Sequence, residues 1–376
     1  MRRSFLPFLA LLLLLHFYIG IRILPGIGLG IPGTAIGILL LLVSAMLVPL
    51  GLGAPRMRWR RRWAEPLTWA ALIAMGYFSS LLVLTFLRDL VLVGMKLFGS
   101  VTPLVAHDSA VAVPLTALAV TLVGFVNARR VARVVKVDVP IAKLPPSLEG
   151  YKIAQISDIH VGPTIKRAYL NAIVNRVNAL KADSIAITGD LVDGSVRRLA
   201  VHTEPLRRLA ARDGVFFVTG NHEYYSGAEE WIAELRRLGL TVLLNEHVVR
   251  KRSDGAVMIA GVADYTAHNF IPAHRSDPQA AASGAVDVDV RILLAHQPRS
   301  AEAASQAGYH LQLSGHTHGG QFFPWNLFVP LQQPFVAGLN RVRDMWVYTS
   351  RGTGYWGPPK RFGAPSEITL LRLIPA

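Results

Sequence analysis

Carboxylate, imidazole and amide side chains gather in five short motifs along the second half of this chain. The candidate metal ligands are Asp158, His160, Asp190, Asn221, His296, His316 and His318, with Asp193 and His222 beside them. Oxygen and nitrogen donors suit divalent manganese, iron, zinc and similar ions, and the ligand types alone do not choose among these metals. Two such ions about 3.5–4 Å apart can activate a water and hold a phosphate ester during in-line displacement. The motifs therefore predict a phosphoesterase with two divalent metal ions as cofactors.

Each motif follows a short apolar run that is typical of a buried β-strand. The runs are residues 151–157, 184–188, 215–219, 292–295 and 311–314. Residues 165–180 and 228–238, which lie between runs, have the periodicity of amphipathic helices. Ligand sites of open α/β sheets lie beyond the carboxyl ends of the strands. We therefore expect an α/β domain over residues 151–376, with the motif side chains together at one edge.

The spacing within the motifs predicts how their side chains meet. In an extended stretch, side chains two residues apart point to the same side, so we expect Asp158 and His160 to bind one ion together. The two histidines of the Gly-His-Thr-His motif would share a face in the same way. The glycines before two other motifs, Gly189 and Gly220, would let the backbone turn sharply toward the metals.

The complete motif set resembles the calcineurin-like metallophosphoesterase superfamily over residues 150–376. The runs 315–321 and 350–354 are similar to its membrane-associated branch, which includes transmembrane proteins with a metallophosphoesterase domain. The resemblance implies a two-sheet sandwich flanked by helices. It also implies a first metal on Asp158, His160 and His318, a second on Asn221, His296 and His316, and Asp190 bridging the two.

The resemblance gives His222 the catalytic role: it protonates the leaving-group oxygen or stabilises the transition state. We expect Asp193 to hydrogen-bond His222 and fix its orientation, as carboxylates do for imidazoles. The alternative for Asp193 is a cap on the following segment. The adjacent Glu223 has no role that the sequence decides.

Residues 1–127 read as a membrane region. A helix needs about 20 apolar residues to cross the hydrocarbon core, and four stretches qualify: 5–24, 33–53, 67–87 and 110–126. Residues 90–98 are too short to span alone, so they are expected to be interfacial or to extend the preceding helix. The sequence therefore predicts four spans, with five as the alternative. A cleaved signal peptide is the alternative for the first stretch, but three later spans favour an anchor. Residues 128–150 are expected to form a basic, proline-containing linker.

Basic residues indicate the orientation of the membrane region. Clusters precede the first span, follow the second (Arg56, Arg58, Arg60, Arg61 and Arg62) and follow the fourth, whereas the alternate loops are poor in net charge. Cytoplasmic loops carry the excess of Lys and Arg. With four spans, all three clusters lie on one side, which predicts an inner or cell membrane protein with a cytoplasmic catalytic domain.

The charge of the chain bears on its partners. Of the 39 Lys and Arg residues, 15 lie in residues 1–149, against only 5 of the 24 Asp and Glu residues. Most of the net charge of +15 thus flanks the apolar spans, where it meets anionic headgroups. We therefore expect membrane lipid and a phosphate ester as partners, and not nucleic acid. The absence of cysteine excludes disulfides and thiolate ligands.

Three functions fit these features. The first is a membrane-anchored phosphoesterase acting on a lipid or a lipid-linked nucleotide. The second acts on a soluble nucleotide or phosphoprotein, and the third is a receptor that binds without turnover. The apolar residues after Gln321 are equally compatible with a packed loop and with a hydrophobic rim near the bilayer. Arg351, Lys360 and Arg361 are candidates for binding a phosphate or a headgroup.

Overall fold

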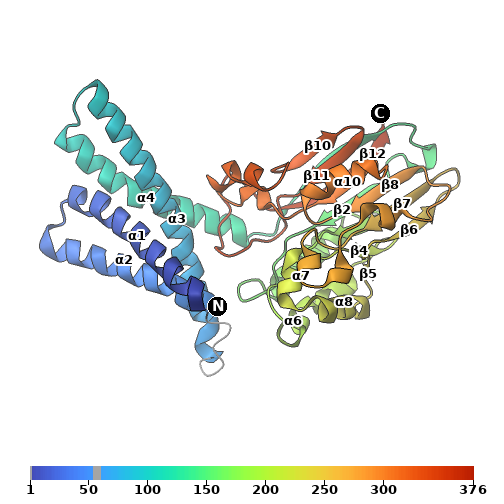
Figure 1. Cartoon of the computed structure of the whole chain (residues 1–376), viewed down its shortest axis with the longest axis horizontal. Helices are drawn as coiled ribbons and strands as arrows, with labels where there is room; N and C mark the ends of the chain where they lie inside the picture. The colour runs from blue at the N-terminus through green and yellow to red at the C-terminus, as the bar shows by residue number, and fades with distance from the viewer. Residues whose placement is uncertain (1, 54–60) are drawn as a thin grey trace. The chain divides into compact units, whose positions relative to one another are not determined.

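The chain folds into two compact units, which the computed structural model describes over residues 2–53 and 61–376 (Figure 1). The first unit comprises Met1–Val126 together with Gly357–Lys360. The second comprises Asn127–Trp356 and Arg361–Ala376. The basic residues Arg56, Arg58 and Arg60, on which the predicted orientation partly depends, lie outside the described residues.

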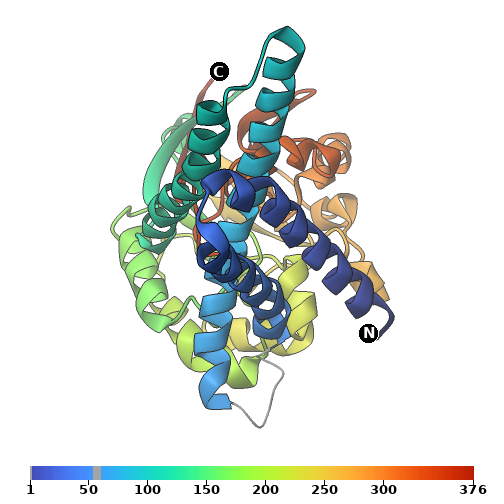
Figure 2. The same ribbon diagram turned by 90° about the vertical axis from the view of Figure 1, so that its left-hand side faces the viewer.

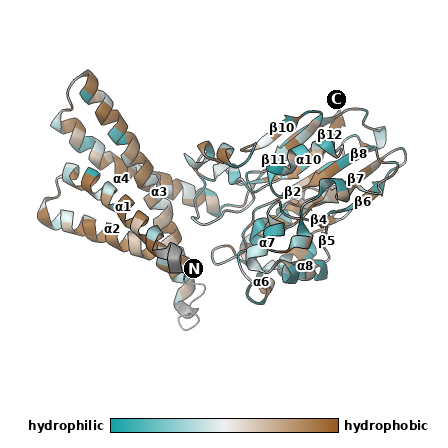
Figure 3. Ribbon diagram, viewed as in Figure 1, coloured by the Kyte–Doolittle hydropathy of each residue, from teal (hydrophilic) through white to brown (hydrophobic). Residues whose placement is uncertain are grey.

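Long apolar helices build the first unit (Figure 2). They are α1 (Arg2–Ile27), α2 (Gly30–Gly53), α3 (Arg61–Phe98) and α4 (Pro103–Arg129). Each is long and apolar enough to cross a membrane, and brown hydrophobic residues predominate along them in Figure 3. The four expected apolar helices are therefore confirmed within the described residues. Helix α3 continues to Phe98, so residues 90–98 extend a helix rather than form a separate interfacial segment.

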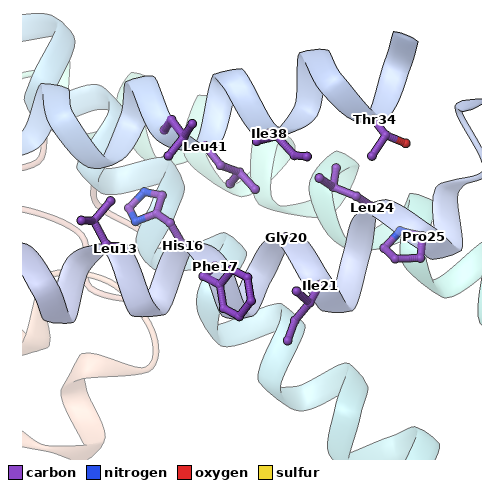
Figure 4. Close-up of a pocket in the computed structure, with 11 residues that line it drawn as sticks. Leu13, His16, Phe17, Gly20, Ile21, Leu24, Pro25, Thr34, Ile38 and Leu41 are labelled. Carbon is purple, nitrogen blue, oxygen red and sulfur yellow. The ribbon is translucent and has the colours of Figure 1, made fainter. Parts of the chain in front are cut away.

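An apolar groove of about 520 Å³ runs between α1 and α2 (Figure 4). His16 lines it, and Nδ1 of this ring donates to the Leu12 carbonyl at 2.7 Å. The Ser44 hydroxyl donates to Nε2 at 3.0 Å, and the ring stacks on Phe78. His16 therefore joins three helices as a hydrogen-bonded structural residue.

Two six-stranded sheets form the second unit. The first has the order β1 (Arg133–Ile141), β12 (Glu367–Pro375), β2 (Lys152–Ile156), β3 (Ser184–Ile187), β4 (Val215–Phe217) and β5 (Thr241–Val242). The second has the order β10 (Gly338–Val342), β11 (Met345–Thr349), β9 (Leu311–Ser314), β8 (Val290–Leu294), β7 (Ala256–Gly261) and β6 (Glu246–Lys251). Strands β2 to β5 are parallel, as are β7, β8 and β9.

Apolar side chains from both sheets meet in one core. Ile153, Phe216, Ile259 and Leu294 are buried there, on strands of both sheets. The opposite face of the first sheet packs against α5 (Arg167–Asn178), α6 (Val196–Thr203) and α8 (Ala228–Arg237). The second sheet packs likewise against α9 (Pro278–Ala282) and α10 (Ala301–Gln306). The predicted two-sheet sandwich with helices outside is confirmed, and α5 and α8 match the two predicted helices.

The stretch expected to be a linker instead contains strand β1. Its nine residues pair in parallel with β12, with Arg133 opposite Glu367 and Ile141 opposite Pro375. Val139 and Ile141 are buried in the core between the sheets. A proline donates nothing to a ladder, but Pro140 is tolerated because β1 is the edge strand of its sheet. The linker prediction gave too much weight to this proline and too little to the alternating valines.

Candidate metal centre

Both sheets deliver ligand-type side chains to this site. Asp158 and Asp190 follow the carboxyl ends of β2 and β3, and Asn221 begins α7 (Asn221–Ser226) shortly after β4. His296 and His316 each lie two residues beyond β8 and β9. The predicted strand runs are all observed, and their motifs converge because parallel strands end at the same edge.

One cluster consists of Asp158, His160 and His318. The Nε2 atoms of the two imidazoles lie 3.0 Å apart, and Nε2 of His318 lies 3.5 Å from Oδ1 of Asp158. All three residues are buried. Two ring nitrogens and a carboxylate oxygen thus face a common point, as ligands of one cation do.

A second cluster consists of Asp190, His296 and His316. Nε2 of His296 lies 3.2 Å from Oδ2 of Asp190 and 3.1 Å from Nδ1 of His316. The other nitrogen of His296 donates to the Thr188 carbonyl at 2.7 Å, which fixes the ring with Nε2 facing the cluster, as backbone carbonyls do for metal-binding histidines. Asn221 is also buried, and its Oδ1 accepts no hydrogen bond from any described residue. A buried amide oxygen without a donor fits a metal ligand.

Asp190 lies between the two clusters. Its Oδ2 is 3.2 Å from Nε2 of His296 in the second cluster and 3.9 Å from Nε2 of His160 in the first. The carboxylate is held in place because its Oδ1 accepts the backbone N–H of His222 at 2.9 Å. The donor set therefore fits two adjacent divalent metals, with Asp190 positioned to touch both.

Asp193 contacts two imidazoles rather than one. Its Oδ1 accepts from Nδ1 of His222 at 2.5 Å, as expected, and also from Nδ1 of His160 at 3.2 Å. The carboxylate thus orients a candidate ligand together with the candidate catalytic histidine. Burial disfavours the charged form of His222, but Asp193 and Asp190 outweigh burial and raise the pKa of this histidine to about 9.

Glu223 is a functional residue that the motif reading left undecided. Its buried carboxylate accepts the backbone N–H groups of Gly220, Asp190, Leu191 and Val192 at 2.6–3.3 Å. Burial, and then the charge of Asp190, raise the pKa of Glu223 to about 7. Glu223 therefore links the loop after β3 to the start of α7, which keeps Asp190 and Asn221 at fixed positions relative to each other.

The backbone at the ligands is left-handed rather than extended. Asp158, His160, Asp190, His316 and His318 have φ between 51° and 70°. Non-glycine residues rarely adopt this region, and such strain gathers at functional sites. The expected period-two geometry of Asp158 and His160 is therefore wrong, although the two side chains do share a cluster. Hydrogen bonds between loops hold the strained backbone, since the N–H groups of both residues donate to carbonyls of the neighbouring loop, those of Gly189 and Asp190.

The two glycines before Asp190 and Asn221 serve different ends. Gly189 has φ +86° and makes the expected sharp turn. Gly220 is extended, with φ −99°, but a Cβ on it would lie 2.2 Å from Oδ1 of Asp190. Gly220 is therefore required because any side chain at this position would collide with Asp190, and not because the backbone turns there.

The three basic candidates near the carboxyl terminus do not form a phosphate site. Arg361 is fully buried and donates to the carbonyls of Gly354, Arg351 and His318, and its Nη2 lies 3.1 Å from Nδ1 of His318. Arg351 pairs with Glu367 at 2.8 Å. Lys360 belongs to the helical unit. Arg361 therefore stabilises the loop that carries His318 through hydrogen bonds.

Comparison with known proteins shows that the sequence of the chain is similar to those of phosphoesterases. The family model described as calcineurin-like phosphoesterase matches residues 151–320. Transmembrane proteins with metallophosphoesterase domain from Danio rerio and Bos taurus are 43% and 42% identical, over 66% and 70% of this chain and 59% and 62% of theirs. An uncharacterized metallophosphoesterase from Aquifex aeolicus is 31% identical over 64% of this chain and 91% of its own length. The chain thus spans about three fifths of the two animal relatives.

Proposed function

Since the chain belongs to the calcineurin-like phosphoesterase family, whose members hydrolyse phosphate esters at a pair of metals, we propose that it acts on the phosphate ester of a lipid or lipid-linked nucleotide. The observation that carries this proposal is the union of four membrane-type helices and a two-metal ligand set in one chain. A membrane anchor confines the site to the surface where amphiphilic substrates accumulate, which raises their effective concentration. Soluble substrates gain nothing from such confinement.

In the proposed site, Asp158, His160 and His318 would hold one metal. Asn221, His296 and His316 would hold the other, and Asp190 would be the ligand that the two share. Two ions so held would supply an activated water and neutralise the phosphoryl oxygens. Support comes from the two facing clusters, from the central Asp190 oxygen and from the unpaired Asn221 oxygen.

We assign proton transfer to His222. Asp193 holds its Nδ1 at 2.5 Å, so Nε2 is the nitrogen left to meet the substrate, and this atom lies 4.0 Å from Oδ2 of Asp190. Nε2 would give its proton to the leaving alkoxide as the phosphorus–oxygen bond breaks. The partly exposed rings of Tyr225 and Trp356 contact His222 edge-on and limit how it turns.

The catalytic unit is proposed to lie in the cytoplasm, at the inner or cell membrane. The support is the distribution of basic residues around an even number of spans. Reporters fused after Ala376 check this: a cytoplasm-dependent reporter should be active, and activity of an export-dependent one instead would reverse the orientation.

The substrate class is tested with the full chain in mixed micelles. Phosphodiesters with one headgroup and short or long acyl chains are compared with the soluble bis-p-nitrophenyl phosphate. We expect lipid turnover to follow the mole fraction of lipid in the micelle surface, because the anchored enzyme meets substrate only there. Turnover of the soluble diester should not depend on that fraction.

Equal rates on monomeric and micellar forms of a short-chain substrate would contradict the lipid assignment and favour a soluble substrate. Binding of either diester without turnover in the metal-loaded protein would favour a receptor instead.

A further inference from the structure

A long uncharged segment directly follows the last metal-ligand motif. Residues 319–340 contain no acidic, basic or histidine side chain, although 17% of the whole chain is charged. The apolar part of this segment includes the short helical turns Trp325–Leu327 and Val329–Leu331. We call residues 323–331 the docking loop. Surface loops of soluble domains are ordinarily polar, so this composition requires an explanation.

The side chains of the docking loop are exposed rather than packed into the core. Phe323, Leu327, Phe328 and Leu331 are 50%, 62%, 52% and 80% exposed. Trp325 is 44% exposed, with its ring 5.7 Å from that of Phe328. Of the two interpretations that the sequence leaves open, the packed loop is therefore wrong. Five large apolar side chains within nine residues form an apolar patch.

Hydrogen bonds tie the start of the docking loop to the segment around Trp356. The side chain of Gln321 donates to the Trp356 carbonyl and accepts its N–H, both at 2.8 Å. Phe323 N–H donates to the Phe362 carbonyl at 3.0 Å. Trp356 is itself 53% exposed and contacts His222. The patch and the candidate catalytic histidine are thus joined through one residue.

The residues between these two ties belong to the helical unit. Gly357–Lys360 groups with the membrane helices, and Nζ of the buried Lys360 donates to the Gly76 carbonyl and the hydroxyls of Ser80 and Thr121 at 2.5–3.1 Å. Ser80 is in α3 and Thr121 in α4, both membrane-type helices. The docking loop is therefore tied by hydrogen bonds to residues that directly precede and closely follow, in the chain, a segment grouped with the membrane-type helices.

We propose that the docking loop, together with Trp356, inserts into the boundary between the headgroups and the hydrocarbon of the bilayer that holds the helices. Tryptophan favours this boundary, and phenylalanine and leucine form the apolar face of segments that lie in it. A segment without charge enters it without dehydrating an ion. Docking would place the rim of the metal centre at the depth of lipid phosphates. This consequence for the substrate rests on the proposed function, whereas the docking itself does not.

The chain contains no cysteine, so single labels can report the docking directly. Phe328→Cys and Leu331→Cys in the full chain receive an environment-sensitive fluorophore and are reconstituted in phosphatidylcholine–phosphatidylglycerol vesicles. The control is Val286→Cys, which is 73% exposed in the segment before β8, at the edge of the sheet opposite the metal centre. Shallow nitroxide lipids probe the bilayer and iodide probes water.

We expect the two docking-loop labels to be quenched by the nitroxide lipids and shielded from iodide, and the Val286 label to show the reverse. Iodide quenching equal to that of the control would overturn the proposal. Shielding from both quenchers would also overturn it, because the loop would then pack on protein, either the helices of its own chain or a second copy.

A turnover measurement separates this inference from the proposed function. In Phe328→Ser/Leu331→Ser, the rate on long-chain diester relative to bis-p-nitrophenyl phosphate should fall about tenfold, as expected for a loss of about 1.4 kcal/mol of surface binding. Val286→Ser should leave the ratio unchanged. Labels that dock in a protein with no preference for the lipid diester would support docking and contradict the lipid substrate.

Discussion

Asp190→Ala is expected to abolish phosphoester hydrolysis, with a loss larger than the roughly 10–100-fold that outer-shell partners of metal ligands cost. The reason is the central position of this carboxylate, 3.2 Å from His296 and 3.9 Å from His160 in the two clusters. In the proposed site Asp190 would be the ligand shared by both ions, so its loss would leave each ion short of one ligand. Rates and bound metal are measured on the full chain refilled with manganese.

Three variants make the Asp190 result interpretable. Asp190→Asn keeps an oxygen to accept the His222 N–H, so its activity reports metal bridging with little loss of folding. Asp193→Asn should lose about 10–100-fold while retaining metal, because in the proposed site Asp193 orients His160 and His222 and is not itself a metal ligand. Asp344→Ala, whose side chain is fully exposed, should change nothing. Wild-type rates in Asp190→Ala would contradict the assignment.

Gly354→Ala is expected to disrupt the first metal cluster although residue 354 is not a ligand. A Cβ here would lie 2.2 Å from the carbonyl oxygen of Ile159 and 2.8 Å from its carbonyl carbon, in the loop that carries Asp158 and His160. The loop cannot give way cheaply, since Gly354 N–H already donates to the Asp158 carbonyl at 3.1 Å. Overpacking of this kind costs about 1–3 kcal/mol, and the strained backbone of both ligands would shift.

The predicted outcome for Gly354→Ala is a chain that binds fewer metal ions, turns over substrate far more slowly and unfolds at a lower temperature. Gly94→Ala is the matched control, because nothing lies within 4 Å of a Cβ there and it sits inside helix α3, where alanine is preferred. Full metal content and rate in Gly354→Ala would show that the loop tolerates the methyl group.

The candidate ligands could be predicted because aspartate, asparagine and histidine are the residue types that bind divalent metals. Apolar runs that end in aspartate or histidine indicate strands and an edge, and both sheets deliver those residues together as expected. The backbone at the ligands was not predictable, since left-handed aspartate and histidine depend on hydrogen bonds between loops from different strands. The bonds from Asp158 and His160 to the loop after β3 are of this kind.

Other features could not be predicted from the sequence, also for physical reasons. In the sequence Glu223 looks like an ordinary polar residue next to His222. Only the folded structure shows that its carboxylate accepts four backbone N–H groups. The residues around Lys360 lie some 230 positions after α4, and no local pattern links them to membrane helices. In the sequence the docking loop looks like part of a hydrophobic core. Its amino-acid composition alone does not show whether an apolar segment contacts lipid or packs against protein.

Metal refilling of the full chain tests the two-metal site most directly. The detergent-purified protein is stripped with chelator, refilled with manganese, assayed for metal content and tested for hydrolysis of bis-p-nitrophenyl phosphate. We expect two ions per chain, no turnover in the stripped protein and recovery of turnover on refilling. Turnover that survives stripping, or its absence with two ions bound, would contradict a two-metal phosphoesterase.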